Sequence, residues 1–257
     1  MRRGPQRGGL ARGGKVVRCF SALRLLLSGC RGNSSHLSCG WQELPMFITF
    51  EGIEGSGKSL QIERTADYLR RRQIRCLVTR EPGGTEFGLA VRQILLRAGG
   101  PHREPMSELL LYLADRHEHL RQVIEPALRA GTTVICDRYH DATRAYQGAA
   151  RRIPPATVDR LTEALGIPEP DRTVLLDIEP VVGLHRARTR NAAAGASITE
   201  GRFEDEAIAF HEEVRKAYLE LAARFPARIH VIDASGSPEA VYSRLRHLLD
   251  EWFPPVG

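Results

Sequence analysis

The chain has 257 residues, of which 42% are apolar, so it is long enough to bury the core of one globular domain. Its formal net charge of +6 would ordinarily point to an acidic partner such as nucleic acid. However, residues 1–45 contain eight basic residues and one acidic residue, and subtracting them from the totals of 37 and 31 leaves 29 basic and 30 acidic residues. Because the rest of the chain is nearly neutral, we expect no nucleic-acid partner.

Residues 1–45 have two interpretations. They are rich in arginine and poor in acidic residues, which is typical of an organelle transit peptide. Alternatively, they are a disordered or wrongly assigned extension, and the natural start is Met46, which leads directly into a predicted strand. Arg18 and Arg24 interrupt the apolar residues of this segment, which leaves no run long enough to cross a membrane. We favour the extension, with one domain over residues 46–257 and no membrane partner.

The five cysteines form no closely spaced pair of the kind found in metal sites or redox motifs. Three of them lie before Met46, and the other two lie in apolar runs. The simplest interpretation is a reduced chain in the cytoplasm, with an organelle as the alternative if residues 1–45 are a transit peptide.

From Met46 onward, short β-rich apolar runs alternate with longer amphipathic segments. This alternation predicts an α/β fold in which a parallel sheet is covered by helices on both faces. Ligands of such sheets bind at the carboxyl ends of the strands, so functional residues are expected there. The predicted strands are 47–50, 75–79, 132–136, 173–177 and 228–232, and the predicted helices are 58–72, 86–97, 104–129, 155–165, 181–190, 203–223 and 238–252.

The first predicted strand is followed by the pattern G-x-x-x-x-G-K-[ST], which is typical of nucleoside triphosphate binding. Its glycines let successive backbone N–H groups converge on phosphate oxygens, and the helix that begins near Lys58 adds the positive end of its dipole. We expect Lys58 to reach the outer phosphates of ATP and the Ser59 hydroxyl group to join the shell of a Mg²⁺ ion. The predicted ATP-binding residues are Gly52, Ile53, Glu54, Gly55, Ser56, Gly57, Lys58 and Ser59.

A second acidic group is needed to hold Mg²⁺, because this ion prefers carboxylate and water oxygens. Asp137 follows the third predicted strand, which puts it at the carboxyl edge of the sheet beside the glycine-rich loop. A helix N-cap is a weaker interpretation of Asp137, because Arg138 follows at once and the next stretch is polar and aromatic. Asp177, after the fourth strand, is the weaker candidate for the metal. Ser59 and Asp137 are therefore the predicted metal-binding residues, partly through water.

Positions near strand ends and on the long helix offer groups for a second substrate. Arginines occur there together with tyrosines, as at Arg80, Arg116, Arg138 and Tyr146. A guanidinium group binds phosphate through two hydrogen bonds and can also read the edge of a base, and a tyrosine ring can stack on a base. These side chains indicate a phosphorylated acceptor with a planar ring. For Arg116, a solvated charge on the helix surface is an equally good interpretation.

The segment Asn191–Gly201 is rich in small residues and is bracketed by arginines at 186, 188, 190 and 202. It lacks the periodicity of a core element, so we expect a mobile loop between two helices. The simpler interpretation is a solvated surface loop whose arginines complement the helix dipole.

Several motifs occur in one order along the chain from Met46 onward: FEGIEGSGKS, TREPGGT, LLYLADR, CDRYHDATRAYQG, the arginine-bracketed loop and GRFEDE. In this order they resemble bacterial thymidylate kinase of the type with arginines in the lid loop. The resemblance implies a P-loop nucleoside monophosphate kinase fold, with a five-stranded parallel sheet, helices on both faces and a mobile lid. It also implies transfer of the γ-phosphoryl group of ATP to dTMP with Mg²⁺, and commonly a homodimer.

The resemblance also implies roles for individual residues at the dTMP site. Arg138 would bind the phosphate of dTMP, and Tyr112 would stack on thymine. Arg116 and Thr143 would address the edge of the base, and Tyr146 would lie near the sugar, where a 2′-hydroxyl group is disfavoured. The implied dTMP-binding residues are Glu54, Arg80, Glu81, Tyr112, Arg116, Arg138, Thr143 and Tyr146.

The source of the catalytic arginine also follows from the resemblance. Some family members use an arginine directly after the acidic residue of the glycine-rich loop, but Gly55 occupies that place here. The arginine is then expected from the lid loop, with Arg190 or Arg188 as the candidate. The implied catalytic residues are Lys58, Arg138, Arg188 and Arg190.

Two other functions fit part of the pattern. A deoxynucleoside kinase shares the glycine-rich loop and the lid arginines but needs a carboxylate base, a part that Glu81 could play. Such a kinase is expected to carry Glu-Arg-Ser where this chain has Asp137-Arg138-Tyr139. A P-loop ATPase or switch without an acceptor pocket is the third possibility, and it would release ADP without dTMP.

Overall fold

Five parallel strands form the centre of the molecule. The computed structural model describes residues 44–193 and 201–254, and the order of the strands in the sheet is β2-β3-β1-β4-β5. Arg80 is paired with Asp137, and Asp137 is paired with Phe50, so the carboxyl ends of β2, β3 and β1 lie side by side. The strands are β1 (Phe47–Glu51), β2 (Cys76–Arg80), β3 (Thr133–Asp137), β4 (Arg172–Asp177) and β5 (Ile229–Asp233).

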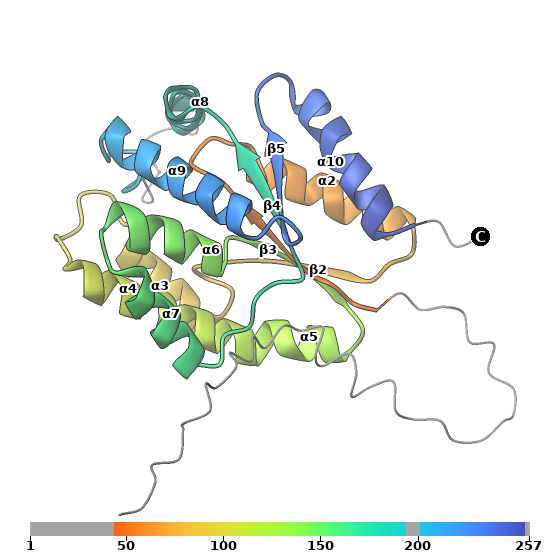
Figure 1. Ribbon diagram of the computed structural model, residues 1–257, viewed down its shortest axis with the longest axis horizontal. Helices are drawn as coiled ribbons and strands as arrows, with labels where there is room; N and C mark the ends of the chain where they lie inside the picture. Colours follow the sequence, from red (N-terminus) through yellow and green to blue (C-terminus); the bar gives the residue numbers. More distant parts are fainter. Residues whose placement is uncertain (1–43, 194–200, 255–257) are drawn as a thin grey trace, which may run out of the picture.

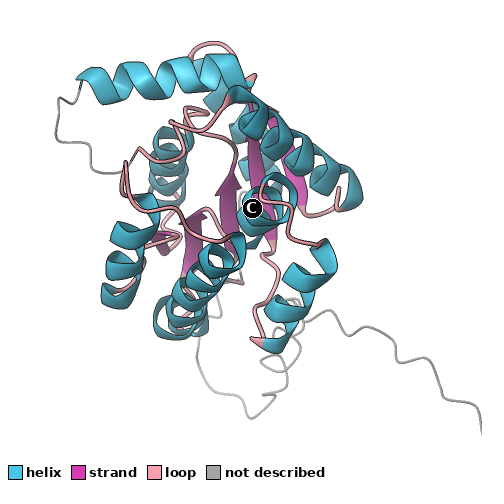
Figure 2. Cartoon of the chain, turned by 90° about the vertical axis from the view of Figure 1, so that its left-hand side faces the viewer, coloured by secondary structure: helices cyan, strands magenta, loops and turns pink. Residues whose placement is uncertain are grey.

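Helices cover both faces of this sheet, as Figures 1 and 2 show. The helices α2 (Lys58–Arg71) and α10 (Pro238–Trp252) contact each other and lie together on one face, and most of the others lie on the opposite face (Figure 1). These others are α3 (Glu86–Leu96), α4 (Pro105–His119), the π-helical turn η1 (Leu120–Ile124), α5 (Glu125–Arg129), α6 (His140–Thr143), the π-helical segment η2 (Arg144–Ala150), α7 (Pro155–Ala164), α8 (Pro180–Ala193) and α9 (Ile208–Arg224).

Successive side chains of β1 fill different parts of the core. Phe47 belongs to the apolar cluster that includes Leu109 of α4, whereas Ile48 belongs to the cluster that includes Leu69 of α2. All five residues of β1 are buried. Because side chains alternate between the two faces of a strand, burial on both faces explains why this strand is a short, nearly continuous apolar run.

The N-termini of the helices are satisfied in different ways. Thr85 accepts a hydrogen bond from the backbone N–H of Gly88 in α3, and Ser237 accepts one from Ala240 in α10. In contrast, α2 begins after Gly57, and no side chain among the described residues caps it with a hydrogen bond. Its first N–H groups remain available, which is the arrangement expected of a helix that receives an anion.

The predicted strands are all confirmed to within one residue at each end, and the predicted parallel α/β architecture is confirmed. The prediction of one continuous α-helix over 104–129 is wrong, because η1 interrupts it with π-helical backbone. The prediction that a helix begins at Phe203 is also wrong, since α9 begins at Ile208.

The residues after β3 form helical turns, α6 and η2, that were not predicted. The sequence there is polar and lacks a clear helical period, and it is the packing of buried side chains such as Tyr146 that stabilises these turns. The prediction of a loop from Asn191 is wrong for its first residues, because α8 continues to Ala193. The rest of the predicted loop, 194–200, and residues 1–43 lie outside the described residues.

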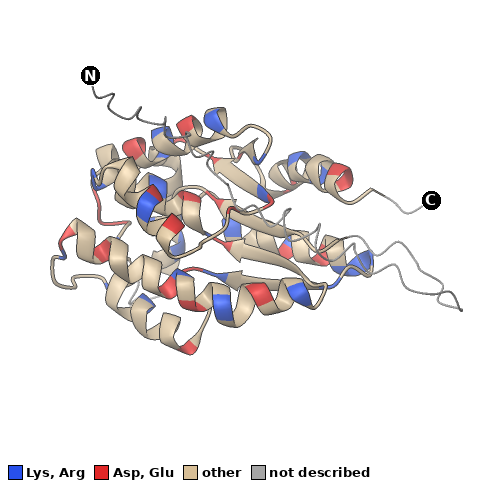
Figure 3. Ribbon diagram, turned by 60° about the horizontal axis from the view of Figure 1, so that its bottom comes forward, with Lys and Arg blue, Asp and Glu red and all other residues tan. Residues whose placement is uncertain are grey.

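Acidic and basic residues are both spread over the helices in the view of Figure 3. This distribution agrees with the nearly neutral composition after residue 45. Within the described residues, no helix is long and apolar enough to span a membrane.

Candidate active site

The glycine-rich loop connects β1 to α2 at the carboxyl edge of the sheet. Gly55 and Gly57 have φ angles of 72° and 90°, in the region that favours glycine, and a Cβ atom at Gly55 would lie 1.9 Å from the carbonyl oxygen of Gly183. Lys58 turns back over the loop, and its Nζ donates hydrogen bonds to the carbonyl oxygens of Gly52 and Ile53 at 2.9 and 3.1 Å. Burial lowers the pKa of Lys58 to about 8, and the charge of Arg138 acts in the same direction.

A cavity of about 290 Å³ opens beside this loop. Most of the residues predicted from the sequence line it: Glu54, Gly55, Lys58, Ser59, Arg80, Glu81, Tyr112, Arg116, Asp137, Arg138, Thr143, Tyr146 and Arg190. The predicted residues Gly52, Ile53, Ser56, Gly57 and Arg188 are not among the residues that line it. The first four belong to the loop itself, where backbone groups rather than side chains would contact phosphate.

Arg138 lines the cavity and follows β3 directly. Its Nη2 donates a hydrogen bond of 2.8 Å to Oε1 of Glu54, and its guanidinium group lies over the ring of Tyr146, 4.8 Å from the ring centre. The φ angle of Arg138 is 67°, which is unusual for a residue with a side chain. Backbone strain of this kind is tolerated where surrounding contacts hold the residue in place, and it is often found at functional sites.

The Glu54 carboxylate has three polar neighbours. In addition to Arg138, it accepts a hydrogen bond of 2.8 Å from the Tyr146 hydroxyl group, and Nδ1 of His211 lies 3.2 Å from Oε2. Burial raises the pKa of Glu54, but Arg138, His211 and Lys58 lower it more, to about 2. Glu54 therefore stays ionised. His211 was missed in the sequence, because it lies on α9 without any local motif.

Behind Glu54, a second buried carboxylate supports the same wall. Glu51 accepts hydrogen bonds from the backbone N–H of Tyr139 at 2.8 Å and from the hydroxyl group of Tyr218 at 2.7 Å. Burial raises the pKa of Glu51 to about 7, and the negative charge of Asp141 adds to this effect. Tyr218 in turn accepts a hydrogen bond of 3.4 Å from Arg138. Glu51 thus holds the backbone next to Arg138, and Tyr218 links Glu51 to the Arg138 guanidinium group.

At the other end of the cavity, Arg116 is 1% exposed, so its interpretation as a solvated helix charge is wrong. Its Nε donates to Glu81 at 2.7 Å, Nη1 to the Thr143 hydroxyl group at 2.7 Å, and Nη2 to the carbonyl oxygen of Tyr139 at 2.9 Å. Arg116 also lies over the Tyr139 ring. A guanidinium group held at three nitrogens presents its remaining N–H groups in one fixed direction.

Two further predicted residues line the cavity from its rim. Tyr112 is half-buried on α4, and burial together with the charge of Glu108 raises the pKa of its hydroxyl group, so the ring stays neutral. Arg80 is exposed at the end of β2. The lining of the cavity thus includes Arg138 beside Glu54 of the glycine-rich loop, Arg116 beside Glu81, and the ring of Tyr112.

Asp137 is positioned to hold a cation, and its surroundings fit that role. It lines the cavity with Ser59 and Lys58, and among the described residues its Oδ1 is buried without a hydrogen-bond partner. A buried carboxylate oxygen without a donor is unfavourable unless it meets a cation or water. Asp177, the weaker candidate, is bound instead by Arg215, whose Nε and Nη2 lie 2.7 and 3.0 Å from its two oxygens.

Comparison with known proteins decides the family. The family model described as thymidylate kinase matches residues 50–245. A thymidylate kinase of Oleidesulfovibrio alaskensis is 48% identical over 209 residues, which make up 81% of this chain and 99% of that protein. This chain belongs to the thymidylate kinase family.

Other relatives agree with this assignment. A thymidylate kinase of Syntrophotalea carbinolica is 50% identical over 203 residues, which cover 79% of this chain and 94% of the relative. Among solved structures, the thymidylate kinase of Ehrlichia chaffeensis is 32% identical and superimposes with a TM-score of 0.62. That match covers 80% of this chain and 98% of the other. The P-loop nucleoside monophosphate kinase fold expected from the sequence is therefore confirmed.

The two candidate lid arginines of this thymidylate kinase family member differ in their surroundings. Arg190 lines the cavity, with Nη2 3.7 Å from the Glu204 carboxylate, and its side chain is 64% exposed. Arg188 donates instead to the backbone oxygen of Glu204 at 3.1 Å and does not line the cavity. Arg202 lines the cavity as well and forms an ion pair with buried Glu108.

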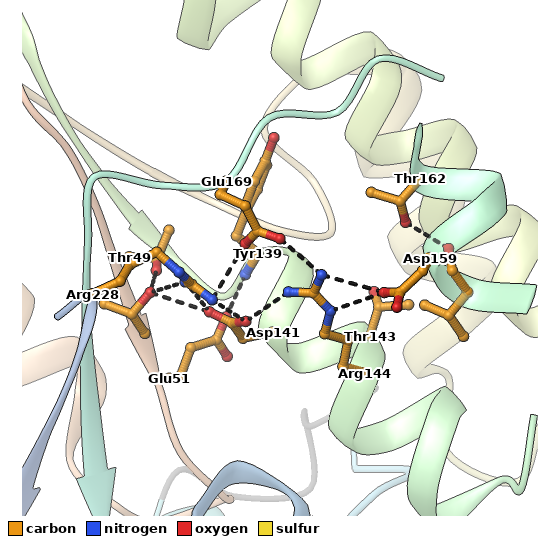
Figure 4. Close-up of polar contacts among 12 residues, drawn as sticks. Thr49, Glu51, Tyr139, Asp141, Thr143, Arg144, Asp159, Thr162, Glu169 and Arg228 are labelled. Atoms are coloured by element: carbon orange, nitrogen blue, oxygen red, sulfur yellow. Dashed lines mark hydrogen bonds and ion pairs between the residues drawn. The ribbon is translucent and has the colours of Figure 1, made fainter. Parts of the chain in front are cut away.

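The helical turn α6, which carries Thr143, is anchored on its far side by a cluster of charges (Figure 4). Asp141 is 1% exposed and accepts hydrogen bonds from Arg228 at 2.6 and 2.9 Å. Arg144 lies 3.4 Å from Asp141 and 2.8 Å from Glu169, and Glu169 also lies 3.3 Å from Arg228. We call these four residues, Asp141, Arg144, Glu169 and Arg228, the α6 anchor.

Next to the α6 anchor, His140 is expected to make the folded protein less stable at acidic pH. It is 1% exposed, and neither ring nitrogen has a hydrogen-bond partner among the described residues. Burial lowers the pKa of His140 well below 6.5, and the charges of Arg144, Arg116 and Arg228 act in the same direction. As the pH falls below 6.5, the unfolded chain takes up a proton that the folded chain resists, so stability falls by up to about 1.4 kcal/mol per pH unit.

We expect His140→Leu to reduce the loss of unfolding free energy between pH 7.5 and 5.0, as measured by urea unfolding at several pH values. The matched control is His247→Leu, since His247 is exposed on α10. An acid-induced loss in the His140→Leu protein equal to that of the unsubstituted protein would contradict the prediction.

Proposed function

We propose that this chain transfers the γ-phosphoryl group of ATP to dTMP, giving ADP and dTDP. The observation that carries the proposal is the position of Arg138 in a cavity next to Lys58, in a member of the thymidylate kinase family. Lys58 binds the phosphates of the donor, ATP, and Arg138 binds the phosphate of the acceptor, dTMP. A P-loop ATPase has no need of this second arginine.

The donor side uses the glycine-rich loop and α2. The backbone N–H groups of Gly52 to Ser59 bind the phosphates of ATP, and Lys58 releases its contacts with the loop carbonyl oxygens to bind the outer phosphates. Ser59 and Asp137 hold Mg²⁺, partly through water. When bound, this ion neutralises phosphate charge. The free Oδ1 of Asp137 supports this assignment.

The acceptor side binds both ends of dTMP. Arg138 binds the phosphate, with Arg80 and Glu81 nearby, and Tyr112 stacks on thymine. The fixed N–H groups of Arg116, together with Thr143, meet the edge of the base. Tyr146, held in place by its hydrogen bond to Glu54, lies near the sugar, where its side chain disfavours a 2′-hydroxyl group.

The acceptor needs no general base in this reaction. The second pKa of a phosphate monoester is about 6, so the attacking oxygen of dTMP is already anionic near neutral pH. Catalysis then consists of placing two anionic groups in line, neutralising their charge and excluding water. Lys58 supplies positive charge on the donor side and Arg138 on the acceptor side. The lid supplies a third positive charge, from Arg190 or Arg188.

A deoxynucleoside kinase is disfavoured by the surroundings of Glu81. Such an enzyme would need a carboxylate with a free oxygen to take a proton from a neutral hydroxyl group. Both oxygens of Glu81 already accept hydrogen bonds, from Arg116 at 2.7 Å and from His119 at 2.9 Å. Glu81 therefore acts as an anchor for Arg116.

Exposed apolar side chains on edge strand β2 and on helices α3 and α4 support a homodimer. The helices α3 and α4 contact each other. Side chains of this kind are usually covered in an oligomer when they form a continuous patch. They are Val78, Phe87, Ile94, Met106 and Leu110. Sedimentation velocity at micromolar concentration tests the dimer. A single domain over 46–257 and a cytoplasmic location are also proposed, on the sequence alone.

The test of the proposed function is ADP release measured in a coupled assay with ATP, Mg²⁺ and a panel of nucleosides and nucleotides. We expect ADP release to require dTMP and to be much slower with thymidine. Release with thymidine but not dTMP would indicate a deoxynucleoside kinase. Release without any acceptor would indicate an ATPase, and either result would overturn the proposal.

A further inference from the structure

His119, the last residue of α4, lies beneath the cavity without lining it. Its side chain is fully buried and lies between two partners from the segment that ends β2. Nε2 is 2.7 Å from the hydroxyl oxygen of Thr79, and Nδ1 is 2.9 Å from Oε1 of Glu81. Both ring nitrogens are therefore occupied, and the ring has one orientation.

Glu81 is held from both sides by the same helix. Its Oε2 accepts from Nε of Arg116, and its Oε1 contacts His119, three residues further along α4. Residues three apart lie on one face of a helix, so both side chains reach the same carboxylate. Because Arg116 also donates to Thr143, a continuous series of hydrogen bonds runs from Thr79 through His119, Glu81 and Arg116 to Thr143.

The chemistry of the partners fixes the directions of these bonds. An ionised carboxylate can only accept, so the Nδ1–H of His119 donates to Glu81. In the neutral ring Nε2 then accepts from the hydroxyl group of Thr79. The ring is a donor to Glu81 with a defined tautomer, and the carboxylate is prevented from turning away from Arg116.

The loop after β2 is packed directly on this ring. A Cβ atom at Gly84 would lie 2.3 Å from Nε2 and Cδ2 of His119, so only glycine allows this approach. The backbone N–H of Glu81 donates to the carbonyl oxygen of Asp137 at 2.9 Å. His119 therefore packs against the loop that follows Glu81, whereas the pairing with Asp137 fixes the backbone of Glu81 itself.

A metal site is a weaker interpretation of the same residues. Glu81, His119 and Cys136 offer ligand atoms within 4.8 Å of one another. However, the guanidinium group of Arg116 already neutralises Glu81 at 2.7 Å, and Nδ1 of His119 points its proton at the same carboxylate. A divalent cation there would have to displace both contacts and lie next to a buried positive charge.

We propose that His119 is a positioning residue for the acceptor site, which holds Glu81 so that Arg116 and Thr143 face the base of the nucleotide in one orientation. This inference rests on the proposed transfer to dTMP. Loss of the bond between His119 and Glu81 is then expected to weaken binding of dTMP and to lower the preference for dTMP over nucleotides with other bases. It leaves ATP binding unchanged.

The test compares two variants of His119, one that keeps the contact with Glu81 and one that keeps the contact with Thr79. In His119→Asn, the amide N–H takes the place of Nδ1–H and can still donate to Glu81, whereas in His119→Gln the amide reaches the place of Nε2 and Thr79. The measurements are KM for dTMP, KM for ATP, the ratio of kcat/KM for dTMP over dCMP, and the unfolding midpoint.

For His119→Gln we expect KM for dTMP to rise about tenfold or more, since a hydrogen bond to a buried charge is lost, while KM for ATP changes less than about twofold. The preference for dTMP over dCMP falls by a similar factor. His119→Asn keeps KM for dTMP within about threefold of the unsubstituted enzyme. If His119→Gln does not fold, Thr79→Val must still raise KM for dTMP, because the ring then loses the bond that fixes Nε2.

Three results would overturn the inference in an enzyme that phosphorylates dTMP. These are an unchanged KM for dTMP in His119→Gln, equal rises in both KM values, or identical behaviour of His119→Asn and His119→Gln. Equal effects of the two variants would mean that the ring acts only by filling space. Absence of dTMP-dependent ADP release from the unsubstituted chain would instead contradict the proposed function itself.

Discussion

Replacing Arg138 by alanine is expected to lower kcat/KM for dTMP by about 1000-fold or more, while the protein remains folded. The size of the effect follows from the charge that an arginine supplies to transferring phosphate groups, which is worth about 10³–10⁵ in rate in related reactions. The fold survives because Glu54 keeps its contacts with Tyr146 and His211. The measurement is ADP release with dTMP varied, together with circular dichroism of the variant.

The chain offers a matched control for this prediction. Arg64 donates to Glu239 at 2.8 Å and lies over the ring of Tyr242, much as Arg138 donates to Glu54 and lies over Tyr146. Arg64 lies on α2 outside the cavity, so Arg64→Ala should change kcat/KM by less than about twofold. Near-normal turnover by a folded Arg138→Ala protein would rule out Arg138 as the acceptor-phosphate ligand.

Replacing Asp141 by alanine is expected to have the largest effect on stability, a loss of about 3 kcal/mol in the free energy of unfolding. Asp141 is buried, and its removal leaves Arg228 with Glu169 as its remaining carboxylate partner among the described residues, while Arg144 keeps Glu169 and the more exposed Asp159 (Figure 4). Breaking one partner of a buried ion pair is costly because the remaining charge was already removed from water. Urea unfolding at pH 7.5 measures the loss.

Asp67 supplies the same substitution at the surface. It pairs with Arg70 at 2.8 Å, but the two side chains are 57% and 60% exposed. Exposed pairs contribute about 0–1 kcal/mol, so Asp67→Ala should be nearly neutral. If both variants lose equal stability, the anchor contributes no more than a surface pair, and Thr143 must be held in place by other contacts.

Local patterns in the sequence predicted much of the site. The glycine-rich loop needs only neighbouring residues, so its position between β1 and α2 could be inferred from strand, glycines and Lys58 alone. Asp137 and Arg138 were found because the end of a parallel strand is marked by the change from apolar to polar residues. The helical turns α6 and η2 were missed, since tertiary packing stabilises them without a clear periodic pattern, and the start of α9 was placed at Phe203 rather than at Ile208.

The sequence by itself determined the fold class, the family and most of the residues that line the cavity. Only the tertiary structure decided their partners: Tyr146 with Glu54, 92 residues apart, Arg228 with Asp141, 87 apart, and His119 with Glu81, 38 apart. The physical reason is that periodicity and capping are local, whereas a buried polar side chain takes the donors and acceptors that the order of the strands and the packing of the helices bring to it.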